Sequence, residues 1–64
     1  MKKFNMGDKV ATLHGVGKIS AIQTDKDGSV EYGVVHDRLL FNLPKGYKQN
    51  DIVYYLAAEV QYVD

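Results

Sequence analysis

The sequence predicts an all-β protein, a small barrel of five to six short strands. Valine, isoleucine, tyrosine, phenylalanine and threonine dominate its apolar segments, and these side chains favour strands over helices. Glycine, aspartate and proline divide the 64 residues into short segments, which is typical of an antiparallel β protein. So few short strands cannot form a two-sheet sandwich, but they can bend into one barrel whose interior is filled by side chains.

The first two strands are predicted over residues 8–13 and 17–24, joined by a tight turn. Gly15 and Gly17 lie in this turn, directly after His14. Because glycine has no Cβ, we expect one of these two glycines to adopt positive φ, or the backbone here to approach another segment closely.

The second strand and the hairpin after it carry two further signals. Ile19 and Ile22 are three residues apart, so both can face the core only if the strand contains a β-bulge. Residues 25–28, Asp-Lys-Asp-Gly, predict a hairpin turn because Asp-Gly tolerates positive φ. Residues 29–36 follow as a third strand with alternating apolar and polar side chains.

The middle of the chain is apolar and then polar. Residues 38–43 predict a fourth strand or an edge segment that ends at Pro44, and residues 44–51 predict a polar loop. Neighbouring residues in a strand point to opposite faces, so Leu39 and Leu40 cannot both face the interior. We expect one of the two to be exposed.

The end of the chain predicts a strand over residues 52–56, one 3₁₀ turn over 57–59 and a short last strand over 60–64. This ending is typical of SH3-like barrels, so the fold predicted for the chain is a small SH3-like barrel. An α-helix over 53–63 is the competing interpretation, which the β-branched and aromatic residues disfavour.

Two adjacent tyrosines lie in the predicted strand over 52–56. Tyr54 and Tyr55 should point to opposite faces, so that one is in the core and the other is exposed.

Length, cysteine content, apolar runs and net charge limit the classes of protein to which the chain can belong. The length predicts one domain over residues 1–64, and the absence of cysteine excludes disulfides and thiolate zinc sites. The chain has neither the apolar run of a signal peptide nor a membrane-spanning stretch, so we expect a cytoplasmic protein. Basic and acidic residues balance at zero net charge, whereas nucleic-acid binders usually carry an excess of positive charge.

The charges are nevertheless sorted along the chain. Residues 1–18 and 38–50 each carry a net charge of +3, and residues 19–37 and 51–64 each carry −3. Folding can gather the two basic segments on one face, or leave mixed solvated faces that favour solubility.

His14 is the first candidate functional residue. Catalysis would need a nucleophile or an orienting carboxylate nearby, and neither serine of the chain lies in a nucleophile motif. His14 and His36 are 22 residues apart without metal-site spacing. We therefore expect no enzyme, no metal and no cofactor, and interpret His14 as a turn residue that bonds the backbone or as a residue that contacts a partner.

Four motifs carry a family resemblance: F-x-x-G-D-K-V at 4–10, H-G-V-G-K-I at 14–19, Y-G-V-V at 32–35 and L-L-F-N-L-P at 39–44. Over residues 1–44 the chain resembles the RNA polymerase-interacting domain of CarD-type regulators and transcription-repair coupling factors. The resemblance implies a Tudor- or SH3-like barrel and contact with RNA polymerase. It does not extend to the last twenty residues.

The partner surface is predicted near the apolar run and the polar loop after it. Aromatic, arginine and leucine side chains are frequent in interfaces, so Arg38, Phe41 and Tyr47 are the first candidates. His14 and Lys18, at the rim of the first turn, form the next surface.

Three functions remain open on the sequence. The first is a protein-binding module, aimed at the transcription machinery or, for a phage protein, at a host factor. The second is a nucleic-acid-binding barrel that uses the lysine-rich segments, and the third is an assembly subunit that oligomerises through an open edge strand.

Overall fold

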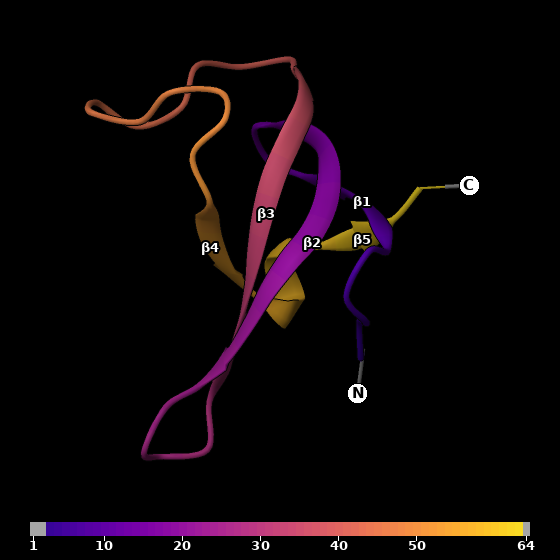
Figure 1. The fold of residues 1–64 in the computed structure, drawn as a ribbon, viewed down its shortest axis with the longest axis vertical. Coiled ribbons are helices and arrows are strands. Elements are labelled where there is room, and N and C mark those ends of the chain that lie inside the picture. Colours follow the sequence, from indigo (N-terminus) through magenta and orange to yellow (C-terminus); the bar gives the residue numbers. More distant parts are fainter. Residues whose placement is uncertain (1–2, 64) are drawn as a thin grey trace.

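The computed structural model describes residues 3–63 and contains one five-stranded antiparallel sheet with the order β4-β3-β2-β1-β5 (Figure 1). The all-β class is confirmed. The elements are β1 (Lys9–Thr12), β2 (Gly15–Thr24), β3 (Val30–Leu39), β4 (Val53–Leu56), the 3₁₀ turn η1 (Ala57–Glu59) and β5 (Gln61–Tyr62).

A long hairpin of β2 and β3 forms the centre of the sheet, and its tip extends away from the other strands (Figure 1). The predicted hairpin turn is confirmed, since Gly28 has φ +88° and the N–H of Asp25 bonds the carbonyl of Ser29 at 2.8 Å. The predicted bulge is also confirmed, because the pairing register shifts between Ile19 and Ala21. The shift turns Ile22 to the face of its partner Tyr32, although Ile22 remains largely exposed there.

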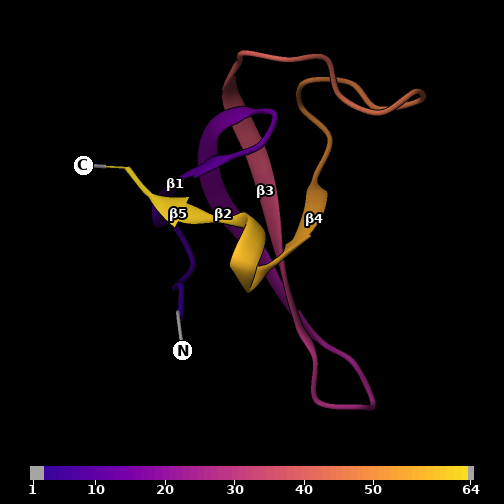
Figure 2. The same ribbon diagram turned by 180° about the vertical axis from the view of Figure 1, so that it is seen from behind.

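The sheet is open between its edge strands. Among the described residues, β4 pairs only with β3 and β5 pairs only with β1. The turn η1 connects the two edges directly, as the view from behind shows (Figure 2). Strand pairing therefore establishes a curved five-stranded sheet, without closing it into a barrel.

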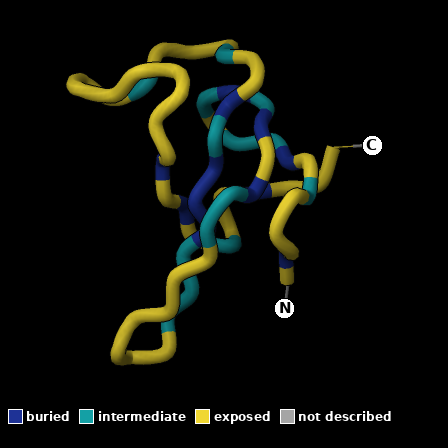
Figure 3. The backbone as a smooth tube through the Cα atoms, viewed as in Figure 1, coloured by how far each residue is buried: buried dark blue, intermediate teal, exposed yellow. Residues whose placement is uncertain are grey.

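One apolar core fills the concave side of this sheet. Its members come from every strand except β5, with additions from the N-terminal segment and from the residue after η1: Phe4, Val10, Ile19, Tyr32, Val34, Val53, Tyr55 and Val60. Buried residues gather in the middle of the molecule, whereas the hairpin tip and the loop before β4 are exposed (Figure 3). As expected, Tyr55 is in the core and Tyr54 is exposed.

Gly15 and Gly17 lie in β2 and not, as predicted, in the turn, which consists of Leu13 and His14; they permit close contact between β2 and β3. A Cβ on Gly15 would collide with the carbonyl oxygen of Arg38, and one on Gly17 would collide with that of Val35. Gly15 also has φ +156°, which agrees with the expected positive φ at one of the two. Glycine is therefore needed at these two positions because the backbones of β2 and β3 approach closely, next to a bulge at Asp37 in β3.

The prediction of a separate fourth strand over 38–43 is wrong. β3 continues to Leu39 through a bulge at Asp37, and residues 40–43 form a bend and irregular chain. The backbone N–H groups of Leu40 and Phe41 both bond the carbonyl of His14, so they are not available to a strand ladder. Leu40 is exposed and Leu39 is half-buried, as expected from their opposite directions.

The C-terminal prediction of strand, 3₁₀ turn and strand is confirmed, and the competing helix over 53–63 is wrong. β5 spans two residues only, and Asp64, at the end of the predicted last strand, lies outside the described residues. Within residues 3–63 no helix has the length and apolar character needed to cross a membrane.

Candidate functional site

Four polar side chains meet at the end of the core beneath the β1–β2 turn. The Tyr55 hydroxyl lies 2.8 Å from Nδ1 of His14 and 3.1 Å from Nε2 of His36. The Thr12 hydroxyl lies 3.0 Å from the same His36 nitrogen and accepts the backbone N–H of His14 at 3.1 Å. We call Thr12, His14, His36 and Tyr55 the polar cluster.

Burial determines how protons are placed in this cluster. His36 is only 2% exposed, and its Nδ1 has no hydrogen-bond partner in the described structure. A buried unpaired acceptor is tolerated better than a buried unpaired N–H, so we assign the proton of the neutral ring to Nε2 of His36. The Tyr55 hydroxyl can then accept from His36 and donate to Nδ1 of His14.

Both central groups of the cluster are held neutral. Burial and the neighbouring His14 lower the pKa of His36, and the weaker influence of Asp37 raises it. Burial and Glu59 raise the pKa of Tyr55, while the hydrogen bond with Thr12 lowers it. Both shifts favour the uncharged form of each side chain at neutral pH.

The polar cluster positions a group of exposed apolar side chains. The carbonyl of His14 accepts the backbone N–H of Leu40 at 2.9 Å and that of Phe41 at 3.1 Å. Leu40 is 58% exposed, Phe41 is 69% exposed, and Leu13, which precedes His14, is 55% exposed. We call Leu13, Leu40 and Phe41 the apolar rim.

The structure brings together some of the predicted contact residues. Arg38 is exposed two residues before Leu40, whose backbone N–H bonds the carbonyl of His14, so Arg38 and His14 lie at the same end of the sheet. Lys18 is exposed on the outer face of β2, two residues from Val16, the partner of Arg38.

Tyr47 belongs to a different region. The loop that carries it extends away from the sheet (Figure 1), and the backbone N–H of Tyr47 bonds Pro44 within the same loop. The side chain of Gln49 anchors this loop by donating to the carbonyl of Asp37 at 3.0 Å. Tyr47 is exposed, and within residues 3–63 neither a hydrogen bond nor a ring contact joins it to Arg38 or Phe41.

His14 differs from its predicted role in one respect. Its backbone makes the turn contacts, but its ring bonds the side chain of Tyr55 rather than the backbone. Leu13 and Tyr55 did not appear among the sequence candidates. The signal for Leu13 was an apolar residue at a turn, and nothing local to Tyr55 indicates a partner 41 residues away.

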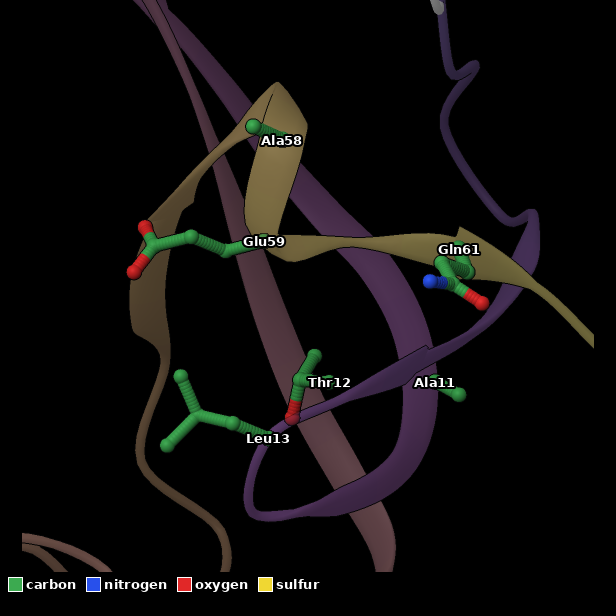
Figure 4. A pocket seen from close by; sticks show the side chains of 6 residues that line it. All are labelled: Ala11, Thr12, Leu13, Ala58, Glu59 and Gln61. Carbon is green, nitrogen blue, oxygen red and sulfur yellow. The ribbon is translucent and has the colours of Figure 1, made fainter.

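A small pocket of about 310 Å³ lies next to the apolar rim (Figure 4). Leu13 and Thr12 line it from the β1–β2 side, and Glu59 and Gln61 line it from the η1–β5 side. The carboxylate of Glu59 accepts the backbone N–H of Leu56 at 2.8 Å.

A larger, mostly apolar hollow of about 630 Å³ opens between the N-terminal segment and the hairpin. Phe4, Ile22 and Tyr32 line it, with Lys3 at its edge. The exposure of Ile22 is explained by this hollow, because Ile22 faces the core side of the sheet but is not covered there.

Among residues 3–63, no group of three or more histidine or acidic side chains could hold a metal ion. The facing nitrogens of His14 and His36 already share the Tyr55 hydroxyl.

Comparison with known proteins does not assign the chain to a family. No family model, curated protein or solved structure matches it.

Proposed function

We propose that the protein is a non-enzymatic protein-binding module with an SH3-like fold, and that it binds its partner through the apolar rim and Arg38. The strand order, the bulged central hairpin and a 3₁₀ turn between the two edge strands support the SH3-like assignment. RNA polymerase, implied by the motif resemblance over residues 1–44, is the first partner to test.

One observation carries this proposal. Two exposed apolar residues, Leu40 and Phe41, are bonded through their backbone N–H groups to the carbonyl of His14, and a third, Leu13, directly precedes His14 in the chain. Exposed apolar side chains held on a rigid backbone, with an arginine beside them, have the composition of a binding hot spot. The polar cluster supplies the rigidity, since it fixes the turn from which Leu40 and Phe41 are anchored.

Affinity capture with matched variants tests the proposal. The immobilised parent, the double variant Leu40→Ser/Phe41→Ser and the control Met6→Ser are each incubated with purified RNA polymerase and with bacterial lysate. Met6 is 60% exposed but lies in the N-terminal segment, so its loss changes a comparable apolar surface elsewhere.

We expect a partner that the parent and Met6→Ser retain and that the double variant loses. Calorimetry with the purified partner then confirms the difference. If every captured protein binds the double variant as well as the parent, this surface is not the binding site.

Assembly through an edge strand is a second candidate, because β4 carries a specific feature. Ile52, Tyr54 and Leu56 are exposed at alternate positions of this edge. The ring of Tyr54 lies over its strand partner Gly33: a Cβ added to Gly33 would be 3.1 Å from Cε1 of Tyr54. An exposed apolar edge can pair with a second copy. Light scattering of the parent and of Tyr54→Lys tests this function: a parent that remains monomeric at high concentration contradicts it.

A further inference from the structure

We propose that the outer face of β1, β2 and β3 binds an extended acidic segment of the partner protein, with its carboxylates seated on Lys9, Lys18 and Arg38. This inference rests on the proposed function and specifies the chemistry of the partner. The three cations come from parts of the chain up to 29 positions apart, and only strand pairing places them together.

Strand register places all three side chains on one face. Lys9 lies directly opposite Lys18, and Lys18 lies opposite Val35. Val16, two residues from Lys18 on the same strand, lies opposite Arg38. Directly paired residues and residues two apart share a face of the sheet, so Lys9, Lys18 and Arg38 all point outward.

The other face of the same strands confirms this direction. The strand positions that alternate with the three cations and their neighbours are buried: Val10, Gly17 and His36. The outward cations are exposed, and half-buried apolar residues lie between them: Ala11, Val16 and Val35.

No acidic partner neutralises these cations in the described part of the chain. Within residues 3–63, none of the three takes part in an ion pair. Asp8, next to Lys9, accepts from the backbone of Asn5 at 2.8 Å and from the Tyr62 hydroxyl at 3.2 Å. Asp37 occupies the bulge beside Arg38 and reduces, without cancelling, the positive charge at this end.

The pairing of Lys9 with Lys18 disfavours folding. Like charges directly opposite each other in a sheet are destabilising, and a local feature that costs stability is expected where function requires it. A carboxylate placed between the two ammonium groups offsets this repulsion. The relief of the repulsion therefore adds to the free energy of binding.

The spacing of the cations predicts how far apart the acidic residues of the bound segment lie. Lys18 on β2 and Arg38 on β3 are diagonal neighbours, because Arg38 pairs with Val16, two residues from Lys18. Such neighbours are roughly 7–8 Å apart, close to the spacing of about 7 Å between alternate side chains of an extended peptide. An acidic residue at each of two alternate positions therefore matches the lysine pair and Arg38. The apolar rim lies immediately beyond Arg38, so apolar residues should follow the second carboxylate.

A protein segment fits this face better than a nucleic acid does. Three cations supply little of the counterion release on which nucleic-acid affinity depends, and the chain as a whole is neutral. The apolar residues between the cations match side chains rather than a phosphate backbone.

The test uses a fluorescein-labelled peptide with glutamate at two alternate positions followed by leucine and phenylalanine. Its control peptide has glutamine in place of both glutamates. Binding is measured by anisotropy for the parent, for Lys9→Gln/Lys18→Gln and for Lys3→Gln/Lys26→Gln, which removes the same charge from other surfaces. Labelled oligothymidylate is titrated in parallel.

We expect Lys9→Gln/Lys18→Gln to weaken binding of the glutamate peptide by about five-fold or more, since each lost exposed ion pair contributes modestly. The Lys3→Gln/Lys26→Gln control should bind nearly as the parent does. The melting temperature of Lys9→Gln/Lys18→Gln should not fall, because the substitution relieves repulsion, so weaker binding would not reflect unfolding.

Any of three results with the peptide would overturn the inference: no binding of the glutamate peptide by the parent, equal loss in both lysine variants, or tighter binding of oligothymidylate than of the peptide. A partner that depends on Leu40 and Phe41 but binds Lys9→Gln/Lys18→Gln normally would also overturn it, while leaving the proposed function intact.

Discussion

The Tyr55 hydroxyl lies 2.8 Å from Nδ1 of His14 and so connects the edge strand β4 to the β1–β2 turn, 41 residues away in the sequence. Backbone pairing does not make this connection, since β4 pairs only with β3 among the described strands. The same histidine holds Leu40 and Phe41 through its carbonyl group. A side chain of the core therefore supports the backbone that presents the apolar rim.

Removing this hydroxyl should weaken the fold. Tyr55→Phe leaves Nδ1 of His14 without its donor and deprives Nε2 of His36 of one acceptor, so we expect the free energy of unfolding to fall by about 1–2 kcal/mol. Urea unfolding measures the change. Tyr54→Phe, on the exposed neighbour, should change stability by less than about 0.5 kcal/mol. Equal effects at the two positions would contradict the role assigned to the polar cluster.

Stability should fall in mild acid because of His36. Its pKa in the folded protein lies below the ordinary value of 6.5, so below that pH the unfolded chain binds a proton that the folded state resists. The contribution is complete above pH 6.5 and is lost as the pH falls toward the folded-state pKa. The slope from this group cannot exceed about 1.4 kcal/mol per pH unit.

Urea unfolding between neutral and mildly acidic pH measures this dependence, with His36→Gln as the control. The variant should be less stable at neutral pH but should show a shallower fall. The same slope in parent and variant would assign the pH dependence to another group.

The start of β2 should not tolerate a side chain at Gly15 or Gly17. In Gly15→Val and Gly17→Val the new Cβ meets a carbonyl oxygen of β3, so we expect each to reduce the free energy of unfolding by about 2 kcal/mol or more. His14→Ala should cost less than either, because His14 is only half-buried. Urea melts that find both valine variants as stable as the parent would show that the close approach is wrong.

Zinc should leave the protein unchanged. The nitrogens of His14 and His36 that face each other are engaged with the Tyr55 hydroxyl, and thiolates are absent from the chain. We expect the melting temperature to be the same with and without equimolar zinc. An increase of several degrees that a chelator reverses would reveal a site.

The candidate contact residues should contribute unequally to the free energy of partner binding. Arg38→Ala and Phe41→Ala should each weaken partner binding by about 1–2 kcal/mol without changing the melting temperature. Tyr47→Ala should have a smaller effect, because its loop extends away from the apolar rim. Calorimetry with the purified partner decides the order; a dominant effect of Tyr47 would place the interface on the loop over 44–51.

Local sequence was sufficient for several features of this fold. Asp27-Gly28 predicted the hairpin turn, the spacing of Ile19 and Ile22 predicted a bulge, and adjacent Tyr54 and Tyr55 predicted one buried and one exposed ring. Each of these depends on neighbouring residues alone, through turn geometry or strand alternation.

Residues 38–43 show where local sequence was not sufficient. Their apolar character suits a strand, but the carbonyl of His14 takes both N–H groups that a strand would use. That competition comes from a turn more than twenty residues earlier, so no pattern within the segment reveals it.

The candidate site divides in the same way. The sequence by itself determined the β class, the turns, the bulge and the residue types available for contact. Only the tertiary structure decided that His14 meets Tyr55, that the carbonyl of His14 holds the backbone of Leu40 and Phe41, and that Lys9, Lys18 and Arg38 share one face. The reason is register: a bulge at Asp37 adds one residue to β3, and in a strand one residue moves a side chain from one face to the other.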